Sequence, residues 1–160
     1  MHHKNTNYLY NLLNPIEIIL TLVVYYKYLS SGKFKTLLAG CVIAFPIFSA
    51  VNVIYFQDFF KEFANYSFFL GGILVSFFSY MVWKNDIKNN IISRNNIILW
   101  FAAANFVYYA STIPIMSAHN WLSVNLKGMA FPIYTLNKVM YGIWAIIIGI
   151  GFIWKRQATT

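Results

Sequence analysis

The sequence predicts an all-α, polytopic membrane protein, a bundle of about five transmembrane helices that forms one domain over residues 1–160. Four long stretches, 36–56, 63–83, 95–118 and 139–154, contain no Asp, Glu, Lys or Arg. With 59% hydrophobic and 10% charged residues, the chain lacks the polar surface that a soluble domain needs. About 20 apolar residues cross a bilayer's hydrocarbon core, where the backbone must satisfy its own hydrogen bonds, so the spans are expected to be helices.

The first span, 8–29, has two alternative starts. Asn14, Pro15 and Glu17 follow the order of a helix N-terminus, with Asn as the cap, Pro in the first turn and Glu reaching back to the cap. A helix from Pro15 to Leu29 would be only about 22 Å long, so the helix could instead bend at Pro15 and extend back towards Tyr8. Because Glu17 interrupts the apolar run and no small-residue cleavage site follows, we expect the segment to be retained rather than removed as a signal peptide.

The remaining spans are expected at 36–56, 63–83, 95–118 and 131–154. Pro46 lies at the centre of the first of these and predicts a bend. Lys138 interrupts the last. The span 63–83 has small residues at three- and four-residue spacings, which let another helix approach closely, so this helix is expected to pack against a neighbour. These residues are Ser67, Gly71, Gly72, Ser76 and Ser79.

The basic residues predict the orientation of the bundle. Five alternating spans place 8 of the 12 on one side and 4 on the other, and the positive-inside rule puts the larger set in the cytoplasm. The N-terminus is then outside and the C-terminus inside. The larger set is Lys27, Lys33, Lys35, Lys84, Lys88, Arg94, Lys155 and Arg156, and the smaller is Lys4, Lys61, Lys127 and Lys138.

The composition also limits partners and cofactors. The net charge of +8 comes from basic residues scattered between apolar spans, which favours topology signals and contacts with lipid headgroups over binding of nucleic acid. Cys41, the single cysteine, excludes an internal disulfide and is expected to act as a small apolar residue within a span. His2 and His3 lack a further ligand at helical spacing, so neither a metal site nor a cofactor is predicted. The expected partners are the bilayer and either another membrane protein or further copies of the chain.

Polar residues gather in the half of the bundle expected to face outside. Glu17 and Lys138 are the only charges well inside apolar spans, and a pair of opposite charges would offset much of each group's desolvation. We therefore expect them to lie together and line a pocket. Alternatively, Glu17 caps a helix and Lys138 extends to the membrane surface along its methylene stem. The predicted outer pocket comprises Glu17, Asn52, Gln57, Asn65 and Lys138.

Enzymatic activity is the less favoured interpretation. The chain has four acidic residues, and only Glu17, Asp58 and Glu62 fall on one side, so general acid–base chemistry has few groups to use. No nucleophile elbow, HExxH motif or glycine-rich phosphate loop is present. No catalytic residue is predicted.

Three segments carry a resemblance to a known group: 9–17 (LYNLLNPIE), 52–57 (NVIYFQ) and 63–67 (FANYS). The chain resembles a family of small bacterial multi-pass membrane proteins with similar "YN…PIE", "N…FxQ" and "NxYS" patterns. The resemblance covers most of the chain and implies the bacterial cytoplasmic (inner) membrane, but no ligand or activity. Members often have two further spans before the first pattern, so this chain corresponds either to a shortened form or to the last five helices of seven.

Three functions follow as alternatives. A sensory or accessory subunit is favoured, because the expected loops are too short to signal without a partner. A transporter component for small molecules or lipids would need a polar route, whereas the expected inner half of the bundle is almost wholly apolar. A lipid-modifying enzyme would need several acidic or histidine residues on one side.

Overall fold

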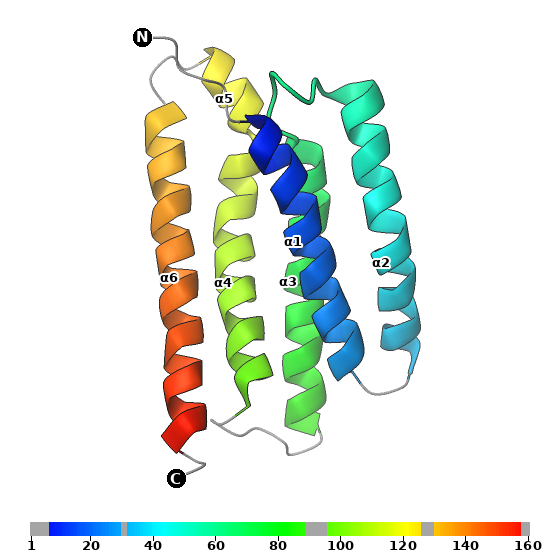
Figure 1. Cartoon of the computed structure of the whole chain (residues 1–160), viewed down its shortest axis with the longest axis vertical. Coiled ribbons are helices and arrows are strands. Elements are labelled where there is room, and N and C mark those ends of the chain that lie inside the picture. The colour runs from blue at the N-terminus through cyan, green and yellow to red at the C-terminus, as the bar shows by residue number, and fades with distance from the viewer. Residues whose placement is uncertain (1–6, 30–31, 89–95, 126–129, 158–160) are drawn as a thin grey trace.

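The computed structural model describes residues 7–29, 32–88, 96–125 and 130–157, and these form a helical bundle without strands (Figure 1). Five helices are long and apolar enough to cross a membrane, which confirms the predicted fold class. Two shorter elements, the π-helical turn η1 and the helix α5, lie between long ones. The bounds are α1 Asn7–Tyr28, α2 Lys33–Val51, η1 Asn52–Phe56, α3 Asn65–Lys88, α4 Ile97–Ser117, α5 His119–Asn125 and α6 Ala130–Gln157.

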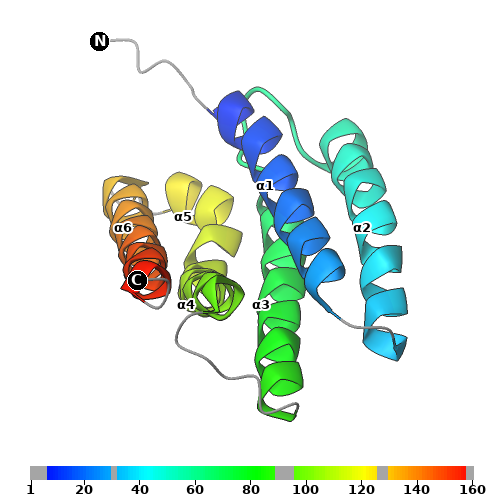
Figure 2. The same cartoon turned by 60° about the horizontal axis from the view of Figure 1, so that its bottom comes forward.

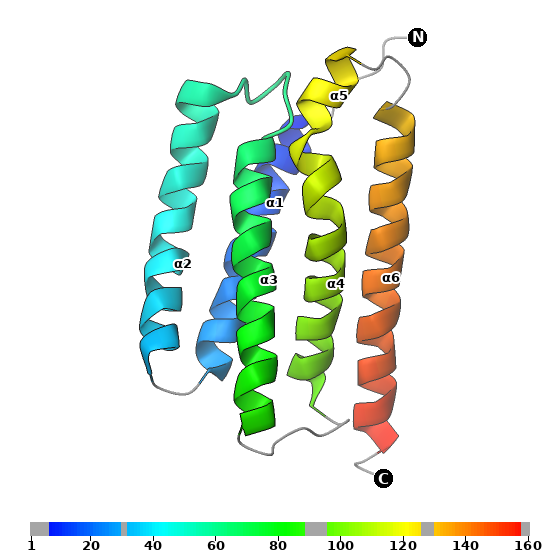
Figure 3. The same ribbon diagram turned by 180° about the vertical axis from the view of Figure 1, so that it is seen from behind.

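The long helices form a row with one helix laid on its face. Seen from behind, α2, α3, α4 and α6 follow one another across the molecule, and α1 lies on the other side of α3 (Figure 3). The tilted view shows the same order, with α2 and α6 at the two edges (Figure 2). We call the end that holds α5 and the start of α1 the α5 end, and the other the opposite end. The α5 end also contains residues 57–64, which connect η1 to α3.

The first helix begins at Asn7, so a start at Asn14 is wrong. Pro15 lies inside the helix, and Glu17 is well beyond the first turn, where it cannot form a capping box. The helix extends through Pro15 because its buried stripe does too: Asn11, Ile18 and the residues after them face the bundle. Packing along that stripe can offset the backbone hydrogen bond that proline removes.

The second span ends at Phe56 as expected, but its last turn is π-helical, and the fourth span is followed by an additional short helix. After α2, the chain widens into the π-helical turn η1, where the Gln57 amide donates to the Asn52 carbonyl over 3.0 Å, five residues back. After α4, a short helix α5 occupies 119–125, where a loop was expected. Both additions lie at the α5 end, so that end carries more structure than the sequence indicates.

The third helix is the centre of the bundle and packs on α1, α2 and α4. Its small residues face those neighbours: Gly71 packs against Ile18 of α1 and Phe45 of α2. A Cβ atom on Gly72 would lie 2.8 Å from Cγ1 of Ile113 on α4. The predicted close packing of this helix is therefore confirmed, and it occurs within the chain.

Candidate functional site

Amide side chains at the α5 end form a buried hydrogen-bonded group. Asn52 Nδ2 donates to Gln57 Oε1 over 2.9 Å and to Ser67 Oγ over 3.0 Å. Gln57 Nε2 donates to Asn65 Oδ1 and, over 3.1 Å, to the Phe63 carbonyl. Asn52 and Gln57 meet because the π-helical turn between them brings the Gln57 backbone amide to the Asn52 carbonyl. Three residues of the predicted outer pocket thus bond to one another.

Two further asparagines extend this group, and sequence analysis did not single them out. Asn11 donates to the carbonyls of Phe59 and Glu62, over 2.9 and 2.7 Å, and accepts from the Ala64 amide over 2.8 Å. Asn120 of α5 donates to the Phe63 carbonyl over 2.8 Å and accepts from its amide over 3.2 Å. Side chains of α1, α3 and α5 therefore hold residues 57–64 in place through hydrogen bonds. We call Asn11, Asn52, Gln57, Asn65 and Asn120 the amide cluster.

Glu17 is placed outside the amide cluster, between α1 and α4. Its carboxyl group hydrogen-bonds with the side chain of Tyr109, which is 2% exposed. Tyr108, next to it on α4, donates to Asn137 of α6 over 2.9 Å. The partner of Glu17 is therefore a tyrosine hydroxyl from the neighbouring helix rather than a cation.

Glu17 and Lys138 form no ion pair in the part of the chain that the structure describes. Lys138 is exposed on α6, and α6 packs chiefly on α4 and α5, whereas α1 packs on α2 and α3. The sequence places both charges at comparable depths, but it does not show that the two helices lie on different sides of α4. The structure therefore does not bring Lys138 together with the other predicted pocket residues.

A second polar group crosses the middle of the bundle and links four helices. Trp144 Nε1 of α6 donates to Asn105 Oδ1 of α4 over 2.9 Å, and Asn105 Nδ2 donates to the Tyr25 hydroxyl of α1 over 3.1 Å. Tyr25 shares a 2.8 Å hydrogen bond with Ser79 of α3. We call these four residues the transverse chain. Their positions overturn the expectation that the half of the bundle away from α5 is almost wholly apolar.

A third polar group surrounds Asp86, which is 1% exposed near the end of α3. Asp86 Oδ2 accepts from the Tyr28 hydroxyl over 2.7 Å and from Asn96 Nδ2 over 3.1 Å. Asn96 also caps α4 by accepting from the Ile98 amide. In the sequence analysis, Asp86 is the one acidic residue that does not share a side with the other three, and no role was assigned to it. The signal it left unused was Asn96 directly before an apolar span, a position where Asn caps helices.

Outside the spans, two ionisable groups have shifted pKa values. The Phe60 amide and the Lys61 side chain both lower the pKa of the exposed Asp58, and Lys61 forms an ion pair with it over 3.2 Å. Burial lowers the pKa of His119, against a smaller opposing effect of Asn120. The His119 ring packs edge-on against Phe63, with 5.5 Å between the ring centres. These groups stabilise the connection 57–64 and α5.

Comparisons with protein-family models, curated proteins and solved structures give no match. The site must therefore be interpreted from its own chemistry. No group of three or more His, Cys, Asp or Glu residues close enough to hold a metal occurs among the described residues. Amide and hydroxyl groups dominate the three buried groups, and in hydrocarbon such groups fix how helices sit against one another.

Proposed function

We propose that this chain is a sensory or accessory membrane subunit that docks on a transmembrane helix of another protein through the outer face of α6. We define that face as five exposed residues on the side of the helix opposite Asn137 and Trp144, which bond to α4: Thr135, Lys138, Gly142, Ala145 and Gly149. The side that faces α4 includes the less exposed residues Ile133, Asn137, Met140, Trp144 and Gly151. The two sets follow the seven-residue spacing of helix packing.

The observation that carries this proposal is that Gly142 and Gly149 face open space. A Cβ atom on either glycine would meet nothing within 4 Å, whereas one on Gly151 would lie 2.6 Å from Cβ of Trp100. Glycine inside a helix costs about 1 kcal/mol relative to alanine. Contacts within the chain account for glycine at 151 but not at 142 or 149. Close approach of a second helix accounts for both.

Lys138 specifies the chemistry of that helix. It lies one turn from Gly142 on the same exposed face, inside a helix that spans the membrane by length and composition. A cation exposed to hydrocarbon is costly, and a carboxylate from a neighbouring helix would offset much of that cost. A parallel second copy would bring two lysines together. We therefore propose that the partner is a different protein whose transmembrane helix carries Asp or Glu at the depth of Lys138.

We further propose that the α5 end of the bundle faces the outside of the cell and that the protein lies in the bacterial cytoplasmic membrane. With the α5 end outside, the cytoplasmic end of the bundle receives seven basic residues from the described part of the chain, and Arg94 adds to the same side of the sequence-based count. The seven are Lys27, Lys33, Lys35, Lys84, Lys88, Lys155 and Arg156. Among the basic residues of that count, Lys4, Arg94 and Lys127 lie outside the described residues. The resemblance to small bacterial membrane proteins supports the bacterial cytoplasmic membrane.

Site-specific photo-crosslinking in native membranes tests the docking face. A benzophenone side chain at Ala145 is expected to capture one partner of defined mass, and the same group at Phe106, a lipid-exposed position of α4, is the control. The captured helix should carry an acidic residue. Lys138→Glu should abolish the adduct, and exchanging the partner's acid for Lys should restore it. Equal capture from Ala145 and Phe106, or an adduct unchanged by Lys138→Glu, would overturn the proposal.

A further inference from the structure

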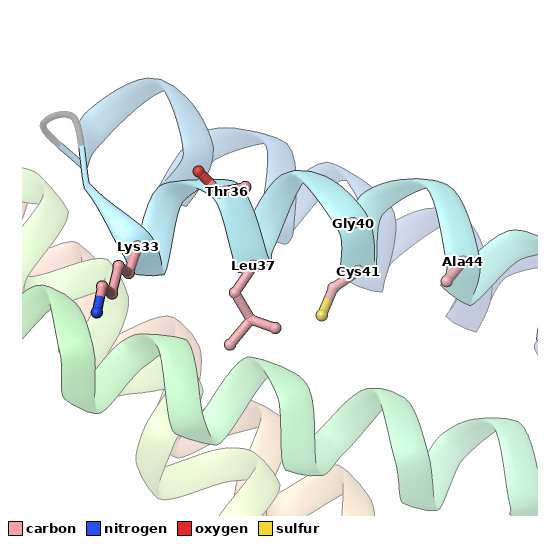
Figure 4. A pocket seen from close by; sticks show the side chains of 6 residues that line it. All are labelled: Lys33, Thr36, Leu37, Gly40, Cys41 and Ala44. Atoms are coloured by element: carbon pink, nitrogen blue, oxygen red, sulfur yellow. The ribbon is translucent and has the colours of Figure 1, made fainter.

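A groove of about 610 Å³ runs along α2 from its first turn to Ala44. In the close view, Lys33 lies at its start, and Leu37, Cys41 and Ala44 follow along the same face of α2 (Figure 4). Gly40 lines the groove, and a Cβ atom there would meet nothing within 4 Å. The groove is thus apolar along its length and cationic at its start.

The start of α2 has an unusual concentration of positive charge. Its N-cap is Gly32, which has no side chain to accept from the first-turn amides, and its first turn contains no acidic residue. Lys33 and Lys35 instead lie at the positive end of the helix dipole, where anions are favoured. The Lys35 ammonium sits over the Tyr26 ring, 4.9 Å from its centre, which leaves Lys33 as the cation of the groove.

The length of the groove matches one leaflet of a bilayer. From Lys33 to Ala44 the helix rises about 16 Å, close to half of a hydrocarbon core of about 30 Å. Beyond Ala44 the exposed face of α2 continues with Ile47 and Val51, but the groove itself does not. An acyl chain that begins at the headgroup region and stops at the midplane fits these limits.

We infer that this groove binds an anionic phospholipid. The lipid phosphate lies at Lys33 in the first turn of α2, and one acyl chain follows Leu37, Gly40, Cys41 and Ala44 towards the midplane. The phosphate supplies the negative charge that the start of α2 lacks. This inference does not depend on the docking face of α6, which lies at the other edge of the bundle.

Native mass spectrometry of the purified full chain, titrated with phosphatidylglycerol or phosphatidylcholine of identical acyl chains, tests this inference. One phosphatidylglycerol molecule should bind, with about fivefold higher affinity than phosphatidylcholine, the ratio expected for about 1 kcal/mol per lysine at an anionic headgroup. Lys33→Gln should remove that preference. Lys155→Gln, the same charge change at the far edge of the opposite end, should keep it.

Gly40→Leu provides a test of the acyl-chain path. Because the space at Gly40 is open, leucine should enter the groove without disturbing the fold and should lower the affinity for both lipids. Equal affinity for the two lipids, equal losses in Lys33→Gln and Lys155→Gln, or lipid binding unchanged by Gly40→Leu would overturn the inference. So would a dimer of the chain formed in place of the lipid adduct.

Discussion

Gln57 Oε1 accepts a hydrogen bond from Asn52 Nδ2, 2.9 Å away, across a single π-helical turn. Gln57 then donates through Nε2 to Asn65 and to the Phe63 carbonyl. One amide side chain thus connects η1, the segment 57–64 and the start of α3. A buried polar group that is left without its hydrogen bond costs more free energy than the bond itself contributes, so this end of the bundle should be sensitive to substitution of Gln57.

Gln57→Leu is expected to destabilise the protein by about 1–3 kcal/mol, because Asn52 and Asn65 would keep their polar groups buried without this partner. Unfolding in mixed detergent micelles measures the change. Asn7→Ala, which removes the exposed hydrogen bond to the Lys61 carbonyl, is the control and should change stability by less than about 0.5 kcal/mol. Equal effects of the two substitutions would show that the amide cluster does not hold this end together.

The transverse chain should show coupling between Tyr25 and Asn105. In a double-mutant cycle of Tyr25→Phe and Asn105→Leu, the coupling energy is expected near 0.6 kcal/mol and at most about 1.7 kcal/mol, the range for hydrogen bonds between membrane helices. Tyr25→Phe combined with Asn11→Ala is the matched control. Those residues lie about 21 Å apart along α1, so their effects should add. A coupling energy of zero in the first cycle would contradict the hydrogen bond between Tyr25 and Asn105 in the transverse chain.

The glycines of the bundle should divide into two kinds. Gly72→Ala is expected to destabilise the isolated protein by about 1–3 kcal/mol, since the new methyl group would lie 2.8 Å from Ile113. Gly142→Ala should leave it unchanged or stabilise it by up to about 1 kcal/mol, because the space there is open. Thermal unfolding in detergent compares the two. Destabilisation by both would mean that α6 packs on another part of the chain.

The spans could be predicted because their signal is local. Long uncharged stretches located four of the five helices, the apolar run interrupted by Glu17 located the first, and the small residues of α3 indicated close packing. Their boundaries were less predictable, since they depend on neighbours: α1 continues through Pro15 along its buried stripe, and α5 forms where only a loop was expected.

The polar groups show a different limit of sequence reasoning. Asn52, Gln57 and Asn65 lie within 13 residues of one another, and their grouping could be anticipated from a common end of the bundle. Single hydrogen bonds of the transverse chain join residues up to 80 positions apart, so the group depends on how four helices are arranged. The Glu17–Lys138 pair failed for the same reason: depth along a helix can be deduced from sequence, whereas position around the bundle requires the packing.

Acidification is expected to loosen α5. Burial lowers the pKa of His119, so the folded protein holds the neutral form while an unfolded histidine binds a proton below about pH 6.5. The stability contributed by the neutral ring is therefore complete above about pH 6.5 and is lost as the pH falls through the folded-state pKa. Amide hydrogen exchange of α5 should accelerate over that range. His119→Phe, which keeps the aromatic contact with Phe63, should remove the pH dependence; the same acceleration in this variant would assign it to another group.

Glu17 and Lys138 should behave independently in the isolated protein. The effects of Glu17→Gln and Lys138→Met on stability are expected to add within about 0.5 kcal/mol, because the two residues share no partner among the described residues. Tyr109→Phe should instead couple with Glu17→Gln, since its hydroxyl bonds with the carboxyl group. The unfolding free energies of the single and double variants give the coupling energy of each pair. If Lys138→Met instead rescued the stability of Glu17→Gln, the result would support the ion pair expected from the sequence and contradict the structure.

The position of α6 at one edge of the row has a consequence for synthesis. The helix packs chiefly on α4 and α5, and its polar and aromatic contacts with α4 include Asn105, Trp100 and Tyr108. The contacts among α1, α2, α3 and α4 therefore involve only residues that leave the ribosome before α6 does. A core of α1 to α4 can be complete while the last helix is still being made, so α6 adds to a surface of α4 that is already formed. For the docking proposed above, the arrival of α6 is also the earliest point at which a partner helix can bind.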